Sequence, residues 1–169
     1  TLPSDQAPKG PQGRLSPDDI APPQSALDAA ADRIAGAKRP LIIVGYGARE
    51  AMDQITAFAR SLNAPVVTTF KAKGQIPDTD PLAAGVLGRS GTPIASWFMN
   101  ECDLIIALGA SFSNHTGIEP KKPIVQVDFD RMQLGKFHPV EIPVWGEVRR
   151  TTGTLRHMLQ ERSIEAIDQ

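Results

Sequence analysis

The chain alternates short, fully apolar segments with segments of helical periodicity, and this alternation restricts its fold more than any other feature. Runs such as 41–45 and 104–108 are short and continuously apolar, which is typical of strands that are buried on both faces. The segments 25–37 and 50–62 instead place apolar residues at helical spacing. Strands joined by single helices predict right-handed parallel crossovers, so we expect an α/β fold.

The remaining elements continue this alternation to the end of the chain. We expect further strands at 65–70, 123–130 and 141–146, and further helices at 93–101 and 147–162. The predicted architecture is a three-layer, doubly wound, mostly parallel sheet of about six strands.

Composition disfavours several classes of partner. The chain has 169 residues, 41% of them hydrophobic and 22% charged, with a net charge of -1, so it lacks the basic surface that nucleic acid or an anionic membrane requires. No apolar run reaches the length of a membrane span, and the N-terminus has no signal pattern, so a cytoplasmic protein is predicted. The single cysteine, Cys102, is expected to be a small buried hydrophobe.

The first 23 residues have the composition of a linker. They contain six of the fifteen prolines and little apolar periodicity. We therefore predict an interdomain linker at 1–23, a nucleotide-binding-like domain at 24–162 and a tail or second linker at 163–169. A disordered N-terminal tail is the alternative.

The stretch from 85 to 114 has the pattern of a nucleotide-site fragment. Gly85, Gly88 and Gly91 are expected to let backbone amides approach a ligand, and Thr92 and Pro93 form a good helix start. The following strand places 109–111 at its carboxyl end, where open α/β sheets bind ligands. No nucleophile, base or metal cluster accompanies this pattern, so another segment is expected to perform any chemistry.

A second glycine loop lies between the first strand and the next helix. Gly45 and Gly47 suit either a bound phosphate, with Arg49 as a donor, or merely a tight turn. Glu50 occupies the third fingerprint position, and no acidic residue follows the second strand near Thr69. These departures disfavour a standard NAD-binding site.

Two acidic residues end the strand at 123–130. Asp128 is predicted to contact a ribose or ribityl hydroxyl rather than a metal, because no histidine or glutamate cluster surrounds Asp128 and Asp130. Lys71 and Lys73 either meet phosphates or keep a loop soluble. His115 is expected to be solvated or to cap a helix.

In their order, these loops resemble the central domain of thiamine-diphosphate-dependent 2-oxo acid enzymes, the group that contains acetolactate synthase and pyruvate oxidase. The resemblance covers roughly 26–159 and rests on five segments. These are AADRIAGAKRPLIIVGYGA, PVVTTFKAKGQIPDTDPLAAGVLGRSGTP, DLIIALGASFSN, PIVQVDFDRMQLGK and PVWGEV.

This resemblance implies the fold, the function and the partners of the chain. The implied fold is Rossmann-like, of the DHS-like NAD/FAD-binding type. The implied function is that of a central domain, inactive alone, in an enzyme that decarboxylates a 2-oxo acid such as pyruvate. Thiamine diphosphate and Mg²⁺ would bind to other domains of the same polypeptide, which is expected to form a homo-oligomer, a dimer or a tetramer.

In the flavin-containing members this domain binds FAD, whereas others bind ADP or no nucleotide. Carried over residue by residue, the resemblance suggests a site at the ends of successive strands. Its expected members are Gly45, Gly47, Arg49, Thr69, Phe70, Leu87, Gly88, Arg89, Gly109, Ala110, Ser111, Asp128, Phe129, Gly146 and Glu147. Two segments depart from acetolactate synthases, which usually have Arg-Phe-Asp-Asp at 111–114 and Gly-Asp at 146–147.

Two alternatives from other functional classes stay open. Small proteins of this fold resemble the epsilon subunit of acetyl-CoA decarbonylase/synthase, a binding subunit without thiamine domains. The domain could equally be a structural spacer that binds no nucleotide, because a fold does not determine a function.

Overall fold

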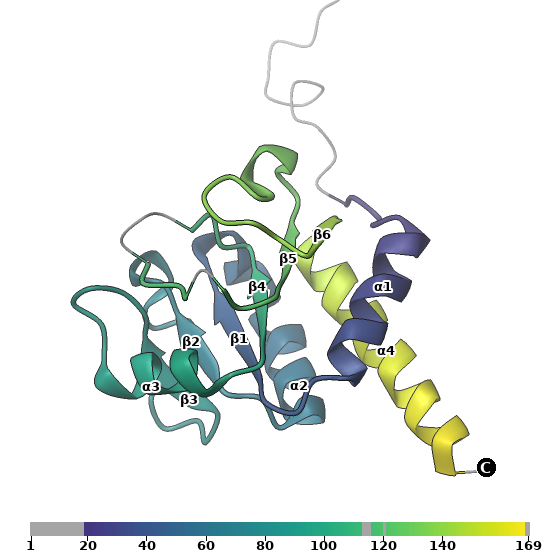
Figure 1. Cartoon of the computed structure of the whole chain (residues 1–169), viewed down its shortest axis with the longest axis horizontal. Helices are drawn as coiled ribbons and strands as arrows, with labels where there is room; N and C mark the ends of the chain where they lie inside the picture. Colours follow the sequence, from purple (N-terminus) through teal and green to yellow (C-terminus); the bar gives the residue numbers. More distant parts are fainter. Residues whose placement is uncertain (1–18, 113–115, 120, 168–169) are drawn as a thin grey trace, which may run out of the picture.

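Six parallel strands form a single sheet in the order β3-β2-β1-β4-β5-β6 (Figure 1). The computed structural model describes residues 19–112, 116–119 and 121–167, so most of the predicted linker at 1–23 lies outside the described residues. The helices are α1 (Gln24–Ala35), α2 (Met52–Leu62), α3 (Pro93–Glu101) and α4 (Val148–Ile167), with 3₁₀ turns η1 (Tyr46–Ala51), η2 (Phe70–Ala72) and η3 (Arg131–Gln133). The strands are β1 (Pro40–Val44), β2 (Val66–Thr68), β3 (Ala83–Val86), β4 (Leu104–Leu108), β5 (Ile124–Asp128) and β6 (Ile142–Trp145).

The strand order reverses direction at β1, which pairs with β2 on one side and with β4 on the other. The chain first builds outward through β2 to β3 and then returns to build β4, β5 and β6. This confirms the predicted doubly wound α/β sheet. Sheets of this order open a crevice at the carboxyl ends of the strands beside the reversal, here β1 and β4.

The two faces of the sheet are covered by different numbers of helices. Alternate strand residues point to opposite faces, so Ile42 and Val44 pack with α1, α2 and α4, whereas Leu41 and Ile43 pack with α3. Figure 1 shows α3 on the other side of the sheet from the three remaining helices. Cys102, at the end of α3, is buried as expected.

Several element boundaries differ from the sequence expectation. Strands β2 and β5 end at Thr68 and Asp128, where strands to 70 and 130 were expected. The edge strand β3 falls where a glycine loop was expected, because its residues AAGV have little of the bulk that marks a strand. The 3₁₀ turn η1 precedes α2, which therefore begins at Met52 instead of Glu50. Helix α4 continues past Arg162 to Ile167, into the segment expected to be a tail.

Helix α3 begins at Pro93, as predicted, but Thr92 does not cap it through its side chain. The Thr92 hydroxyl instead accepts a hydrogen bond from the Val86 amide and donates to the Val86 carbonyl. It thereby fastens the helix start to the end of β3. Within the described ranges, no helix is long and apolar enough to cross a membrane.

Candidate functional site

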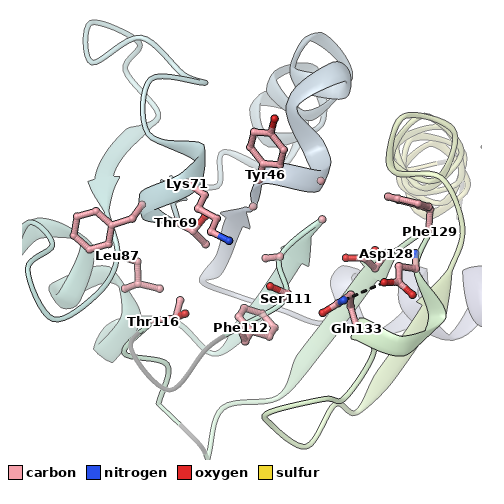
Figure 2. Close-up of a pocket in the computed structure, with 16 residues that line it drawn as sticks. Tyr46, Thr69, Lys71, Leu87, Ser111, Phe112, Thr116, Asp128, Phe129 and Gln133 are labelled. Carbon is pink, nitrogen blue, oxygen red and sulfur yellow. Dashed lines mark hydrogen bonds between the residues drawn. The ribbon is translucent and has the colours of Figure 1, made fainter.

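A cleft of about 490 Å³ opens at the carboxyl ends of β1, β2, β4 and β5 (Figure 2). This is the position where doubly wound sheets hold ligands, and the volume is within the usual range of ligand pockets. The cleft is lined by Gly45, Tyr46, Gly47, Thr69, Phe70, Lys71, Leu87, Gly109, Ala110, Ser111, Phe112, Thr116, Asp128, Phe129, Asp130 and Gln133.

The floor of the cleft is formed where the loops after β1 and β4 meet. Gly45 donates its amide hydrogen to the Leu108 carbonyl at 2.9 Å, and Gly47 donates to the Gly109 carbonyl at 3.0 Å. Gly109 has φ +56°, and a Cβ there would lie 2.5 Å from the Ala48 nitrogen. The close approach of the two loops therefore explains why glycine is needed at these positions. The amides of Gly45 and Gly47 already donate hydrogen bonds to backbone carbonyls.

The glycines of the 85–91 segment also serve local packing. A Cβ on Gly85 would overlap the Thr92 hydroxyl, and one on Gly91 would overlap the Val86 carbonyl. The Gly91 amide donates to Gly88. Of the segment 85–91, only Leu87 lines the cleft.

Asp128 ends β5 with its side chain in the wall of the cleft, and the residue is only 4% exposed. Its Oδ1 accepts a hydrogen bond from the Asp130 amide at 2.9 Å. Burial raises the pKa of Asp128, and the nearby Asp130 charge acts in the same direction. A carboxylate in this position can accept hydrogen bonds from the hydroxyl groups of a ligand.

Asp130 is occupied by the turn that follows. Its two carboxylate oxygens accept from the Met132 amide and from Gln133 Nε2, both at 3.0 Å. The Gln133 hydrogen bond contributes most to lowering the pKa of Asp130. Because the Gln133 amide nitrogen must face this carboxylate, its Oε1 points elsewhere, and it is buried without a hydrogen-bond partner.

The opposite wall carries a cation and aromatic rings. Figure 2 shows Lys71 extending from η2 into the opening, across from Asp128. Tyr46 and Phe70 line the cleft near Lys71, whereas Phe129 lines it beside Asp128, and all three rings are about half exposed. The cleft therefore combines a positive group, an acidic group and flat apolar surfaces, which suits a ligand with anionic, hydroxyl and aromatic parts.

Ten of the fifteen predicted site residues line this cleft. They come from five segments that the sequence places far apart, at the carboxyl ends of β1 to β5. They are Gly45, Gly47, Thr69, Phe70, Leu87, Gly109, Ala110, Ser111, Asp128 and Phe129. Their binding of a ligand remains a prediction.

The other five predicted residues lie outside the cleft lining. The Arg49 guanidinium stacks 4.5 Å from the centre of the Tyr46 ring and pairs with Glu50. Glu147 accepts hydrogen bonds from the amides of Arg149 and Arg150 at the start of α4. The remaining three are Gly88, Arg89 and Gly146, and Gly146 packs against Pro22 and Thr151.

Four lining residues were not anticipated from the sequence. Tyr46 had a usable signal, because it lies between the two glycines of the first loop. Phe112, Thr116 and Gln133 had none, since their place depends on how their loops fold back. Ser113, Asn114 and His115 lie outside the described residues, so the expectation for His115 has no structural counterpart.

In the part of the chain that the structure describes, no group of three or more histidine, cysteine or acidic residues could hold a metal ion. Among the described residues that line the cleft there is no cysteine or histidine.

Comparison with known proteins identifies the family. Residues 27–155 match the family model for the thiamine pyrophosphate enzyme central domain. The chain belongs to this family. The expected resemblance is thereby confirmed across most of the described domain.

Two acetolactate synthase large subunits illustrate how this central domain relates to longer proteins. The subunit of Parasynechococcus marenigrum is 34% identical over 151 residues, and that of Haemophilus influenzae is 33% identical over 137 residues. The matches cover 85% and 77% of this chain, respectively, and 24% of each relative. The chain thus spans about a quarter of the length of these two relatives.

A solved structure agrees with the fold of this central domain. The X-ray structure of a "putative thiamin diphosphate-dependent enzyme" from Mycobacterium smegmatis superposes with a TM-score of 0.71 at 24% identity. The match covers 86% of this chain and 30% of that chain. At this identity the likeness supports the fold alone.

Proposed function

We propose that the cleft binds the ADP moiety of a nucleotide, either as part of FAD or as free ADP. The observation that carries this proposal is the buried carboxylate of Asp128 at the end of β5, in a cleft of about 490 Å³ beside the strand-order reversal. Acidic side chains at such strand ends accept hydrogen bonds from ribose hydroxyls. Asp128 is therefore proposed to hold the ribose.

Lys71 is proposed to hold the diphosphate. Of the lining residues that the structure describes, it is the only lysine or arginine, and Figure 2 shows it reaching toward the opening. Arg49 is directed to Tyr46 and Glu50, and the amides of Gly45 and Gly47 have backbone partners. A phosphate would therefore depend on Lys71 more than on the first glycine loop.

Calorimetry with ADP, FAD and NAD tests this assignment. The 169-residue chain should bind ADP or FAD and should lose about tenfold in affinity on Asp128→Asn, since a hydrogen bond to a charged acceptor contributes about 1.5–3 kcal/mol. Asp28→Asn, at an exposed carboxylate on α1, is the matched control. Equal affinity in both variants would reject the role of Asp128.

The FAD and ADP arms separate the two ligands. Tight binding of FAD with a yellow purified protein would identify a flavin site, whereas binding of ADP alone would identify a nucleotide site without flavin. No heat and no thermal shift with any of the three compounds would leave the domain as a structural spacer, because a ligand of the folded state must raise its stability.

The full-length protein is proposed to be a thiamine-diphosphate-dependent enzyme of the acetolactate synthase group. Its central domain would orient a nucleotide, while other domains hold thiamine diphosphate and Mg²⁺, the groups that supply the decarboxylation chemistry. Consumption of pyruvate by the full-length protein should require both thiamine diphosphate and Mg²⁺. Activity without added thiamine diphosphate, after its removal by dialysis, would contradict the proposal.

The full-length protein is further proposed to form a homo-oligomer. Light scattering at several protein concentrations should give a mass of two or four chains. A single-chain mass for an active preparation would reject this assembly.

A further inference from the structure

The two loops on the acidic side of the cleft are held together by one buried side chain. Gln126 lies in the middle of β5 and is 0% exposed. Its Nε2 donates to the carbonyl of Ala110, in the loop after β4, and to the carbonyl of Gln133, both at 3.0 Å. Its Oε1 accepts from the Gly135 amide at 2.9 Å.

These three hydrogen bonds use most of what a buried amide can offer, and all three end on loop backbone. Ala110 and Gln133 themselves line the cleft, and Gly135 follows in the same turn as Gln133. The Gln126 side chain therefore connects the segment 109–112 to the segment 131–136 by hydrogen bonds to both. Hydrogen bonds between a side chain and buried backbone are strongly directional, so this connection restricts the distance between the two walls.

The position of the second loop carries a cost that the Gln126 contacts offset. Gln133 Oε1 is buried without a hydrogen-bond partner, which is unfavourable. The loop nevertheless keeps this arrangement, held at its backbone by Gln126 and at the Gln133 side chain by Asp130. Asp128 lies two residues along β5 from Gln126, so the same strand supplies both the carboxylate and the amide.

We propose that Gln126 is a positioning residue that sets the separation of the 109–112 and 131–136 loops and thereby the ligand affinity of the cleft. Its contribution to affinity rests on the proposed nucleotide function, whereas its effect on the two loops does not. Gln126 does not line the cleft, so it acts through Ala110 and Gln133.

Hydrogen exchange in the 169-residue chain tests the positioning role without any ligand. Gln126→Leu leaves three backbone groups unpaired, so amide exchange should become at least tenfold faster in both 109–112 and 131–136 and stay unchanged in β1 and β2. Thr152→Val is the matched control, because Thr152 is also fully buried and donates only within α4. Acceleration of one loop alone, acceleration of all segments, or the same acceleration of both loops in Thr152→Val would overturn the proposal.

Gln126→Glu provides a second variant that separates positioning from a general loss of stability. A protonated glutamate can donate to one carbonyl and accept from Gly135, whereas an ionised glutamate faces two carbonyl oxygens. Relative to the wild type, both loops should therefore exchange faster at pH 8 than at pH 5, after correction for intrinsic rates. An effect that does not vary with pH would contradict the proposal, and this variant also serves if Gln126→Leu does not fold.

Titration with ADP then measures the consequence for binding. Gln126→Leu should bind ADP at least tenfold more weakly, while Thr152→Val should bind as the wild type does. If the wild type binds neither ADP nor FAD, the nucleotide function fails, and the exchange rates alone decide the positioning role. If the loops loosen but ADP affinity is unchanged, the claim that Gln126 controls affinity is rejected.

Discussion

Gly45 and Gly109 contact each other backbone to backbone at the base of the cleft. A Cβ on Gly45 would overlap the carbonyl oxygen of Gly109, and the neighbouring Gly47 amide donates to that same oxygen. The loops after β1 and β4 can approach this closely only without side chains. Glycines of this kind therefore stabilise the crevice itself, whether or not a phosphate lies above them.

Gly45→Ala should destabilise the fold by about 3 kcal/mol, because the new methyl group has to displace backbone. Urea unfolding measures the change. Gly36→Ala is the control, since Gly36 has φ -81° and a Cβ there would lie no closer than 3.7 Å to its neighbours. That variant should be neutral or slightly more stable. Equal effects at the two positions would contradict the packing argument.

Asp128 should make the stability of the protein fall as pH rises. Because burial raises its pKa in the folded state, the folded chain keeps a proton that the unfolded chain has already lost. Between the ordinary aspartate pKa of about 3.9 and the raised folded value, unfolding therefore becomes easier as pH increases. Asp128→Asn removes this dependence, so its stability relative to the wild type should increase through that window and then level off.

Urea titrations at several pH values, on the wild type, Asp128→Asn and Asp78→Asn, provide the measurement. Asp78 is exposed in the connection between β2 and β3, so its variant should follow the wild type. If the stability of Asp128→Asn instead falls relative to that of the wild type as pH rises, the dependence has the wrong sign.

Asp103 should have the opposite dependence on pH. Its carboxylate accepts from the amides of Lys38 at 2.8 Å and Arg39 at 2.9 Å. Burial acts to raise the pKa of Asp103, but these hydrogen bonds outweigh it and lower the pKa. The stabilisation is therefore present above the ordinary aspartate pKa and is lost as pH falls through the lowered value.

Asp103→Asn should cost about 1 kcal/mol at pH 7, because one of the two amides then faces an NH₂ group. The loss should shrink as the solution becomes acidic and the wild type is protonated. Chemical unfolding at pH 7 and pH 3 compares the two conditions. A loss that is as large at pH 3 as at pH 7 would show that the carboxylate charge is not involved.

Trp145 should report binding in the cleft. Its indole nitrogen donates to the carbonyl of Phe129, a lining residue, at 2.9 Å. The other tryptophan, Trp97, lies on α3 near the amino ends of the strands, beside Pro40 and Pro65. The emission change on adding ADP should persist in Trp97→Phe and disappear in Trp145→Phe. The reverse pattern would place the ligand at the other end of the sheet.

The sequence predicted the strands that are buried on both faces, because burial leaves a continuous apolar run such as the one in β4. It failed at β3, an edge strand of small residues. The residues predicted directly after β1, β2, β4 and β5 lie together in one cleft, since the carboxyl ends of parallel strands meet at one edge. The sequence did not predict which way a side chain points when that direction depends on contacts beyond its own strand.

Arg49 and Lys71, the two candidate phosphate-binding cations, show that the sequence does not predict the direction of such side chains. Arg49 follows the first glycine loop and was a natural choice, yet its guanidinium stacks on Tyr46, while Lys71 faces the cleft. Gln126 carried no signal, because a single polar residue within an apolar strand gives no indication of its partners. The two carbonyl groups and the one amide that its side chain contacts lie 7 to 16 positions away along the chain.

By itself, the sequence determined the alternation of strands and helices, the family and the loops that gather at one end of the sheet. Periodicity and turn residues are local properties, so they can be recognised without coordinates. Only the tertiary structure decided that Gly45 and Gly109 pack against each other, that Lys71 replaces Arg49 at the opening, and that Gln126 connects two walls. These features depend on distances between segments remote in the chain, which the sheet order establishes and no local pattern records.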